Sequence, residues 1–299
     1  MASPMDAAGD WRLTARTNFH THTTWCDGKA TPFEMAEAAV ARGFAALGFS
    51  SHMIRAFDDG CAVPMGRERA YVDDVRRAAA AFAGRLKVFC GAEADFVRGR
   101  AEPDRARYAD LALDYLIGSL HYVVAPDGAA VAVDDTPERL AEGLREHFGG
   151  SAERFVRTYF AQEREMAQSF DFDFLAHPDL VRKFNARHPY FDEASPWYRE
   201  ELERTAEAIA ASGKLVEVNT GAIARGWLDD AYPSEGFRAL LRARGVRFVL
   251  SSDAHSPEGL DCAFDRFAKA EAYVWPSLAS GPLPWHGELR DETATAMMR

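Results

Sequence analysis

The chain has 299 residues, of which 47% are hydrophobic and 27% are charged, with a formal net charge of −11. This composition is ordinary for a globular protein, and the length suits either one large domain or two small ones. The acidic balance argues against a general nucleic-acid binder, because no basic excess is available to neutralise phosphates. Because the sequence has no uninterrupted apolar run of about 18 residues, we expect no membrane-spanning segment.

The start of the chain and its cysteines indicate a cytoplasmic protein. The first residues, MASPMDAAGDWRL, lack the basic region and the apolar core of a signal peptide. The four cysteines form no CxxC motif and have no paired spacing, which is typical of free thiols in a reducing compartment. They are Cys26, Cys61, Cys90 and Cys262.

Short β-branched or aromatic runs alternate with longer amphipathic stretches, a pattern typical of βα units around a parallel sheet. In chain order, the sequence predicts a strand over about 15–19, a helix over 31–43, a strand over 45–50, a helix over 65–84 and a strand over 86–93. After a short helical piece, it predicts a strand over 113–120, helices over about 136–147 and 151–169, and a strand over 172–176. The order ends with a helix over 196–212, a strand over 214–219, a helix over 234–245 and a strand over 246–253.

The first predicted helix has clear terminal signals. Thr31 is the expected N-cap, Pro32 takes the first helical position and Glu34 closes a capping box, while Gly43 ends the helix. Seven βα repeats in a chain of this length predict an α/β fold with a closed or nearly closed barrel rather than two domains. We expect a single domain over residues 1–299, with a core of about 15–270 and an irregular tail packed across its outside.

Metal-binding residue types gather directly after the predicted strands, where barrels of this kind place their chemistry. Six of the nine histidines lie at these strand ends, with carboxylates beside them. The strand-end residues are His20, His22, Asp27, His52, Glu93, His121, His177, Glu217, Asn219, Asp253 and His255. The remaining histidines fall outside this pattern, and we interpret them as ordinary polar residues: His147, His188 and His286.

Each of these residues is a weak signal by itself, because a lone histidine is more often a satisfied polar group than a metal ligand. In a parallel barrel, however, all of them point toward the same mouth. Leaving unpaired imidazoles and carboxylates together there without a cation costs free energy of desolvation and carboxylate repulsion. The pairs His20 with His22 and Asp253 with His255 also project from one side of an extended chain. The pattern therefore predicts a metal centre, whose mixed ligands suit zinc, manganese or iron better than calcium.

The strand-end motifs also form a recognisable series. In chain order they are H-x-H (20–22), Asp27, S-H (51–52), G-A-E (91–93), G-S-L-H (118–121), A-H-P-D-L (176–180) and S-D-A-H (252–255). This series resembles the polymerase and histidinol phosphatase family over about residues 18–255. The resemblance implies a distorted seven-stranded (βα)7, TIM-like barrel with a trinuclear site for three divalent metal ions.

The resemblance also implies which residues hold each ion. The first ion would take His20, His22, Glu93 and Asp253. The second would share Glu93 and add His121 and His177. The third would take Asp27, His52 and His255. Some relatives have a histidine where this chain has Asp27, a departure that bears on which metal the third site prefers.

The chemistry expected of such a centre is phosphoester hydrolysis. Two metal ions roughly 3.5–4 Å apart can hold a bridging hydroxide, which forms at a pH of about 7 and attacks phosphorus in line. The predicted catalytic residues are Asp253, His255 and Arg225. The predicted substrate-binding residues are Arg225, Asn219, Arg182 and Lys183, although each of the basic ones could equally be a solvated residue.

Within the family, FDFLAHPDLVRKF followed by EVNTGA resembles the histidinol-phosphate phosphatase branch. We therefore expect a small phosphorylated substrate, L-histidinol phosphate, to be hydrolysed to L-histidinol and phosphate in histidine biosynthesis. Three alternatives stay open: the same chemistry on a sugar phosphate or a nucleotide, a metal-dependent amidohydrolase, and a non-catalytic scaffold of this fold. The trio Asp27, His52 and His255 disfavours the amidohydrolase, whose one- or two-metal site does not need it. The sequence leaves the oligomeric state open.

Overall fold

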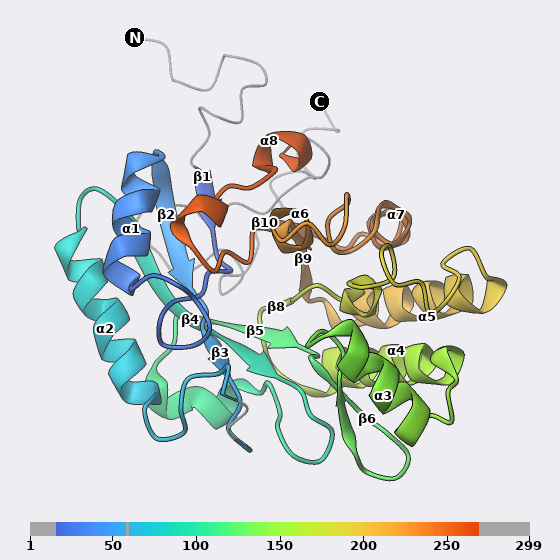
Figure 1. Cartoon of the computed structure of the whole chain (residues 1–299). Coiled ribbons are helices and arrows are strands. Elements are labelled where there is room, and N and C mark those ends of the chain that lie inside the picture. The colour runs from blue at the N-terminus through green and yellow to red at the C-terminus, as the bar shows by residue number, and fades with distance from the viewer. Residues whose placement is uncertain (1–15, 58–59, 269–299) are drawn as a thin grey trace, which may run out of the picture.

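The computed structural model describes residues 16–57 and 60–268. Its main sheet is a nearly closed parallel barrel (Figure 1), which confirms the predicted fold class. The path around the barrel runs through β1 (Arg16–Asn18), β2 (Phe44–Phe49), β4 (Lys87–Asp95), β5 (Tyr115–Ser119), β8 (Phe174–Leu175), β9 (Leu215–Asn219) and β10 (Phe248–Ser251). Each strand pairs with its neighbour in parallel, as βα repeats require.

Helices cover the outside of the barrel (Figure 1). They are α1 (Pro32–Ala41), α2 (Glu68–Ala81), α3 (Pro137–His147), α4 (Ala152–Ser169), α5 (Pro196–Ser212), α6 (Gly221–Ala224), α7 (Glu235–Arg242) and α8 (Phe264–Phe267). Short 3₁₀ turns lie at Arg105–Leu111, Leu180–Arg182 and Pro257–Gly259. No helix in the described ranges is both long enough and apolar enough to cross a bilayer.

The barrel closes between the first and the last strand of its path. Beyond the ends of β1 and β10, Thr21 and Ala254 form an isolated parallel bridge. The His22 amide donates to the Ala254 carbonyl at 2.8 Å, and the Ala254 amide donates to the His20 carbonyl at 3.3 Å. The seam of the barrel therefore lies within the two segments that carry the predicted H-x-H and S-D-A-H ligands.

Large apolar side chains fill the barrel interior below its mouth. One buried cluster there consists of Phe19, Ala46, Phe89, Tyr115, Ile117, Phe174, Ala176, Leu215 and Val249. Tyr115 lies at its centre, and its hydroxyl donates to the Phe19 carbonyl at 2.7 Å. A Cβ atom at Gly48 or Gly91 would come within 2.4 Å of the Tyr115 ring or hydroxyl, so these positions have no room for a larger residue. The floor beneath the site is therefore apolar and close-packed.

The predicted strands and helices agree with the structure to within a few residues at each end. The capping box is present as predicted, because the Thr31 side chain accepts from the Glu34 amide and Glu34 accepts from the Thr31 amide. Several short elements were not predicted: β3 (His52–Met53), which pairs with β4, the antiparallel hairpin of β6 (Tyr122–Val124) and β7 (Ala130–Ala132), and the short helices α6 and α8. The single-domain extent stays a prediction, and the predicted C-terminal tail lies outside the described residues.

Candidate metal centre

Glu93, near the end of β4, lies at the middle of the site and is fully buried. Its two carboxylate oxygens contact the imidazole rings of five histidines from four different segments of the chain. The distances to the nearest ring nitrogen are 3.0 Å for His20, His52 and His177, and 3.5 Å for His22 and His121. One carboxylate therefore joins residues that are spread over most of the sequence.

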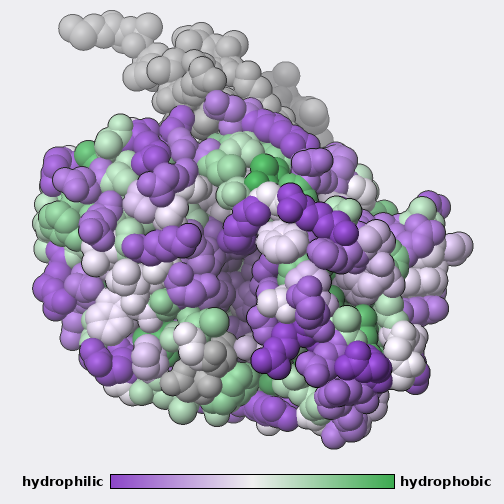
Figure 2. Space-filling view, in the orientation of Figure 1, coloured by the Kyte–Doolittle hydropathy of each residue, from purple (hydrophilic) through white to green (hydrophobic). Residues whose placement is uncertain are grey.

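The strand register explains this convergence. In the parallel pair β3–β4, His52 lies directly opposite Glu93. His121 follows β5 and His177 follows β8, at the same edge of the sheet as the end of β4. Because neighbouring parallel strands end at one edge, their first polar residues meet there. The space-filling view shows a hollow over this central part of the barrel (Figure 2).

His20, His22 and Asp253 form the first group that could hold a metal ion, since one ligand atom from each lies within 4.8 Å of the others. All three are buried. His22 Nε2 lies 3.1 Å from Asp253 Oδ1. This group comes from the two chain segments that close the barrel, so the seam itself carries potential ligands.

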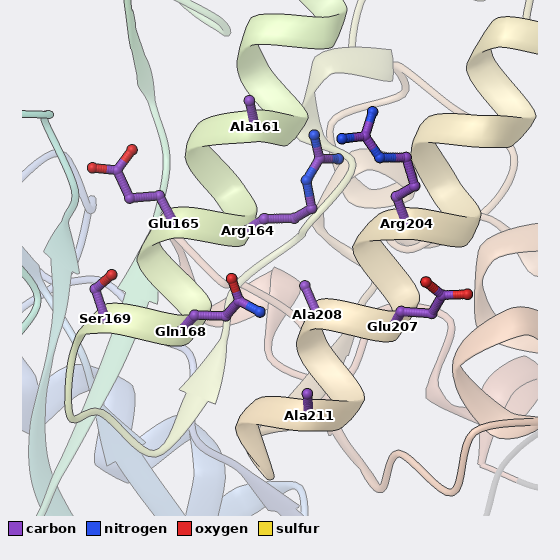
Figure 3. A pocket seen from close by; sticks show the side chains of 9 residues that line it. All are labelled: Ala161, Arg164, Glu165, Gln168, Ser169, Arg204, Glu207, Ala208 and Ala211. Atoms are coloured by element: carbon purple, nitrogen blue, oxygen red, sulfur yellow. The ribbon is translucent and has the colours of Figure 1, made fainter.

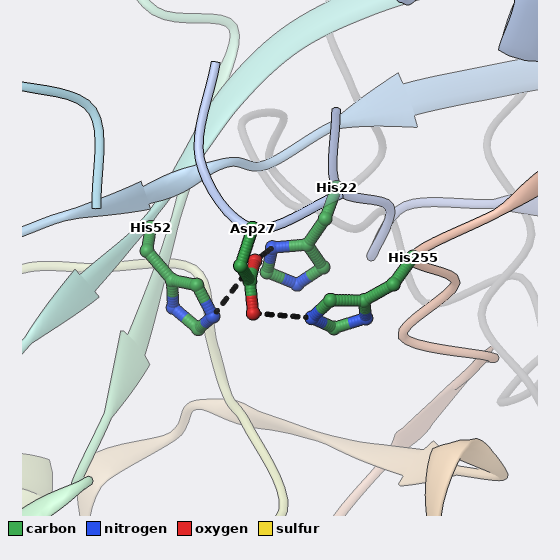
Figure 4. Close-up of side chains that lie close together, drawn as sticks. All are labelled: His22, Asp27, His52 and His255. Atoms are coloured by element: carbon green, nitrogen blue, oxygen red, sulfur yellow. Dashed lines mark ion pairs between the residues drawn. The ribbon is translucent and has the colours of Figure 1, made fainter. Parts of the chain in front are cut away.

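His22, Asp27, His52 and His255 form a second group of this kind. In Figure 4 the three imidazoles surround the Asp27 carboxylate, with His52 and His255 approaching it from opposite sides. The distances from the Asp27 oxygens are 3.1 Å to His255 Nε2, 3.7 Å to His22 Nδ1 and 3.8 Å to His52 Nε2. The predicted trio of the third ion is therefore brought together.

A third group consists of His52, Glu93 and His121. Here the geometry differs in detail from the predicted ligand set, which assigned Glu93, His121 and His177 to one ion. His177 Nε2 does lie 3.0 Å from Glu93 Oε1, but His52 shares the same carboxylate. All nine predicted ligands thus lie at one mouth, while their division among ions stays a prediction.

Outer carboxylates orient two of the predicted ligand histidines. Glu217 on β9 contacts His20 Nδ1 at 2.8 Å, and Asp95 on β4 contacts His121 Nδ1 at 2.7 Å. In both histidines the other ring nitrogen, Nε2, faces Glu93. A carboxylate on the far nitrogen fixes the tautomer and the ring orientation of a ligand histidine. Glu217 was noted among the strand-end residues but given no role, and Asp95 was missed.

Burial and neighbouring charges shift the pKa values of the site residues in opposite directions. Burial lowers the pKa of His20, but the carboxylates of Glu217 and Glu93 outweigh burial and raise it well above its ordinary value. For His22, burial and the charge of His255 lower the pKa to about 3. Burial raises the pKa of Glu93, yet the surrounding imidazoles reverse this effect and bring it well below its ordinary value. Ionised carboxylates and a neutral His22 are the forms that bind metal ions.

The donor set fits divalent cations. His22 Nε2 is buried and has no hydrogen-bond partner among the described residues, although carboxylate oxygens lie 3.1 and 3.5 Å away. A buried polar atom of this kind is costly unless another partner satisfies it. Imidazole nitrogens and carboxylate oxygens are ligands suited to zinc, manganese or iron. A cation between them would satisfy His22 and relieve the crowding of the carboxylates.

Two of the predicted ligands have a left-handed backbone, since φ is 22° at His177 and 51° at Asp253. This conformation is uncommon for residues other than glycine and costs of order 1–3 kcal/mol. Such outliers cluster at functional sites. The His177 amide donates to Glu217 at 2.8 Å, which helps to hold this unusual conformation.

Arg225, a predicted catalytic and substrate-binding residue, lies beside the centre. Its Nη2 donates to Asp253 Oδ2 at 2.8 Å, and its Nη1 lies 3.3 Å from His255 Nδ1. Asn219 is fully buried and donates to Glu217 at 2.7 Å while accepting from the Gly221 amide at 2.7 Å. The amide of Asn219 is thus engaged with the protein, in a position that supports the outer carboxylate.

The neighbouring residues Arg182 and Lys183 point in different directions. Arg182 is buried and donates to Glu193 at 2.6 Å, so its charge is used within the loop after β8. Lys183 donates to the side chain of Asp134 at 3.0 Å. Both predicted phosphate-binding residues in this loop are therefore engaged in ion pairs within the protein.

Other candidate features lie away from the centre. His147 pairs with Asp127 at 2.9 Å on the surface, as expected for an ordinary polar residue. A groove between α4 and α5 is lined mainly by charged and small side chains (Figure 3), and it contains none of the predicted site residues. The Arg164 side chain in that groove already donates to Glu201 at 2.7 Å.

The barrel and its polar mouth define a protein with a metal-binding centre at the carboxyl ends of parallel strands. Residues 18–221 match the PHP domain family, and the chain belongs to this family. This confirms the resemblance that the strand-end motifs indicated. The "probable histidinol-phosphatase" of Deinococcus radiodurans is 32% identical over 256 residues, which cover 82% of this chain and 88% of the relative.

Solved structures agree on the fold. A crystal structure from Listeria monocytogenes that carries a histidinol phosphatase assignment matches with a TM-score of 0.74 at 18% identity, covering 84% of this chain and all of that one. Histidinol phosphate phosphatase from Lactococcus lactis, in complex with zinc, L-histidinol and phosphate, matches with a TM-score of 0.60 at 22% identity. That match covers 81% of this chain and 87% of the Lactococcus protein.

Proposed function

We propose that the protein is a metal-dependent phosphomonoesterase that hydrolyses L-histidinol phosphate to L-histidinol and phosphate in histidine biosynthesis. The observation that carries this proposal is the contact of one buried carboxylate, Glu93, with five imidazoles at the barrel mouth. The Deinococcus relative is named for this activity, and the Lactococcus structure holds both products of the reaction with zinc. A cytoplasmic location follows from the proposed pathway.

We propose a trinuclear centre held by the nine predicted ligands. Bound divalent cations would supply Lewis-acid chemistry, activating water as the nucleophile and neutralising charge on the phosphoryl oxygens. The nine residues are His20, His22, Asp27, His52, Glu93, His121, His177, Asp253 and His255. Zinc, manganese and iron all suit this ligand set.

The chain's own residues have three tasks in this reaction. Asp95 and Glu217 hold His121 and His20 in the ring orientation that presents Nε2 to the centre. Arg225 places a fixed positive charge next to Asp253, where a transferring phosphoryl group gains electrostatic stabilisation. The buried floor beneath Glu93 excludes water from the lower side of the site.

Elemental analysis of the purified protein, combined with phosphate release from L-histidinol phosphate, tests the proposal. We expect about three ions per chain and turnover of this substrate above that of sugar phosphates and nucleotides. His22→Ala should lower phosphate release to background and reduce the metal content, while circular dichroism reports an intact fold. Equal or faster turnover of nucleotides would overturn the substrate, and one ion per chain with amide hydrolysis would favour an amidohydrolase.

A further inference from the structure

The rim of the centre next to His121 and His177 is built from two loops that are joined by an ion pair. Lys183 Nζ donates to the Asp134 carbonyl at 2.7 Å and to Asp134 Oδ2 at 3.0 Å. Val133, which lies between the end of β7 and Asp134, donates its amide hydrogen to the His121 carbonyl at 2.8 Å. Asp134 is thus fixed beside one predicted ligand, and Lys183 lies six residues after the other.

The two carboxylate oxygens of Asp134 have different surroundings. Its Oδ2 accepts from Lys183, whereas Oδ1 has no hydrogen-bond partner among the residues of the described ranges. The side chain is 27% exposed. Burial raises the pKa of Asp134, but the charges of Lys183 and His121 outweigh burial and lower it to about 2. The carboxylate is therefore ionised at neutral pH.

The other carboxylates around the centre already contact side chains of the protein. Asp95 contacts His121, Glu217 contacts His20, and Asp253 contacts both His22 and Arg225. Burial lowers the pKa of Arg225, but the charge of Asp253 and, more weakly, that of Asp134 raise it. Among the described acidic residues near the mouth, Asp134 therefore combines partial exposure, charge and an unused acceptor.

We propose that Asp134 selects for an ammonium group on the phosphoester by accepting its N–H at Oδ1. This inference rests on the proposed function, because L-histidinol phosphate carries an ammonium on the carbon next to the one bearing the ester oxygen. With the phosphoryl group at the metal centre, that ammonium lies near the rim. A hydrogen bond between two charged groups is roughly twice as strong as one between neutral groups. Lys183 holds the carboxylate in place through Oδ2 and leaves Oδ1 directed away from the pair.

Asp134→Asn tests this role with little structural disturbance. The amide oxygen of asparagine can still accept from Lys183, and the bond from Lys183 to the residue 134 carbonyl is kept. We compare L-histidinol phosphate with 3-(imidazol-4-yl)propyl phosphate, which lacks only the amino group, using the metal-loaded full chain. The ratio of kcat/KM between the two substrates should fall about 10- to 100-fold in Asp134→Asn, as expected for a charge-assisted hydrogen bond, chiefly through KM.

Two further variants separate recognition from loop positioning. Asp135→Asn changes the exposed neighbour and should leave the ratio at the wild-type value. Lys183→Met breaks the ion pair but keeps the carboxylate, so the preference for the amino substrate should persist. An unchanged ratio in Asp134→Asn, or the same profile for Asp134→Asn and Lys183→Met, would overturn the role of Asp134 alone. A wild-type enzyme that is inactive on L-histidinol phosphate would overturn the proposed function itself.

Discussion

Two fully buried glutamates of this protein, Glu93 at the barrel mouth and Glu163 on α4, meet opposite surroundings. Glu93 contacts five imidazoles, whereas neither carboxylate oxygen of Glu163 has a hydrogen-bond partner in the part of the chain that the structure describes. Burial and the nearby charge of Asp179 raise the pKa of Glu163 well above its ordinary value. The imidazoles around Glu93 lower its pKa in spite of the same burial.

This difference shows that burial alone does not make a carboxylate functional. Without positive partners, a buried acid keeps its proton and is neutral. With imidazoles on both of its oxygens, the acid is an anion that can hold a cation. The contrast can be tested by removing the charge from Glu93, from Glu163, or from Asp95, the carboxylate that orients one of the histidines around Glu93.

Glu93→Gln should have the largest effect. The substitution keeps the shape of the side chain but removes the charge that the cations and imidazoles share. Because metal ions supply several kcal/mol of transition-state stabilisation, kcat/KM should fall at least about 1000-fold. The measurements are steady-state phosphate release and metal content per chain. Glu138→Gln, at an exposed position on α3, is the matched control; a Glu93→Gln enzyme with full activity and full metal content would contradict the central role of Glu93.

Asp95→Asn should have an intermediate effect. Loss of the outer carboxylate frees the His121 ring, and such losses typically cost 10–100-fold in metal affinity or activity. Metal affinity is measured by competition with a chromophoric chelator. Asp127→Asn is a suitable control, because Asp127 makes the same type of contact with His147 on the surface. If the Asp95→Asn and Asp127→Asn variants both had wild-type metal affinity and activity, Asp95 would have no role in orienting His121 for metal binding.

Glu163→Gln should have the smallest effect on phosphate release, and its main effect is on stability. Since the folded-state pKa of Glu163 is raised, the native state retains a proton that the unfolded state releases above its own pKa of about 4.5. Wild-type stability therefore falls as pH rises above that value, by about 1.4 kcal/mol per pH unit until the folded-state pKa is reached. Glutamine does not titrate, so the variant should be the more stable protein at pH 8 and nearly equal at pH 5. Urea unfolding of the metal-loaded protein at both pH values measures this, and a difference independent of pH would show that Glu163 has an unperturbed pKa.

The fold and the position of the candidate metal centre could be predicted from the sequence, because both follow from local patterns. Apolar runs of strand length mark the barrel, and residues such as His121 and His177 stand directly after two of them. Parallel strands end at one edge, so a linear order of strand ends translates into a spatial cluster. Asp95 could have been found in the same way, because it lies two residues after Glu93 on one strand and shares its face.

Other features depend on tertiary contacts that have no local signal. Asp134 follows a short hairpin outside the barrel path, so no strand-end rule places it near the centre. Arg182 and Lys183 are adjacent in sequence, but the 3₁₀ turn Leu180–Arg182 directs one toward Glu193 and the other toward Asp134. The partner of Arg182 lies in the same loop, whereas the partner of Lys183 comes from a distant one, and only the folded chain decides between them.

The seam between His20–His22 and Ala254 has a consequence for the order of assembly. Asp253 and His255 lie beyond the last barrel strand, so a growing chain that has not yet emerged past this point has an unfinished cation site, however well its earlier strands have docked. Two of the three potential ligand groups are therefore complete only when the two ends of the strand path meet.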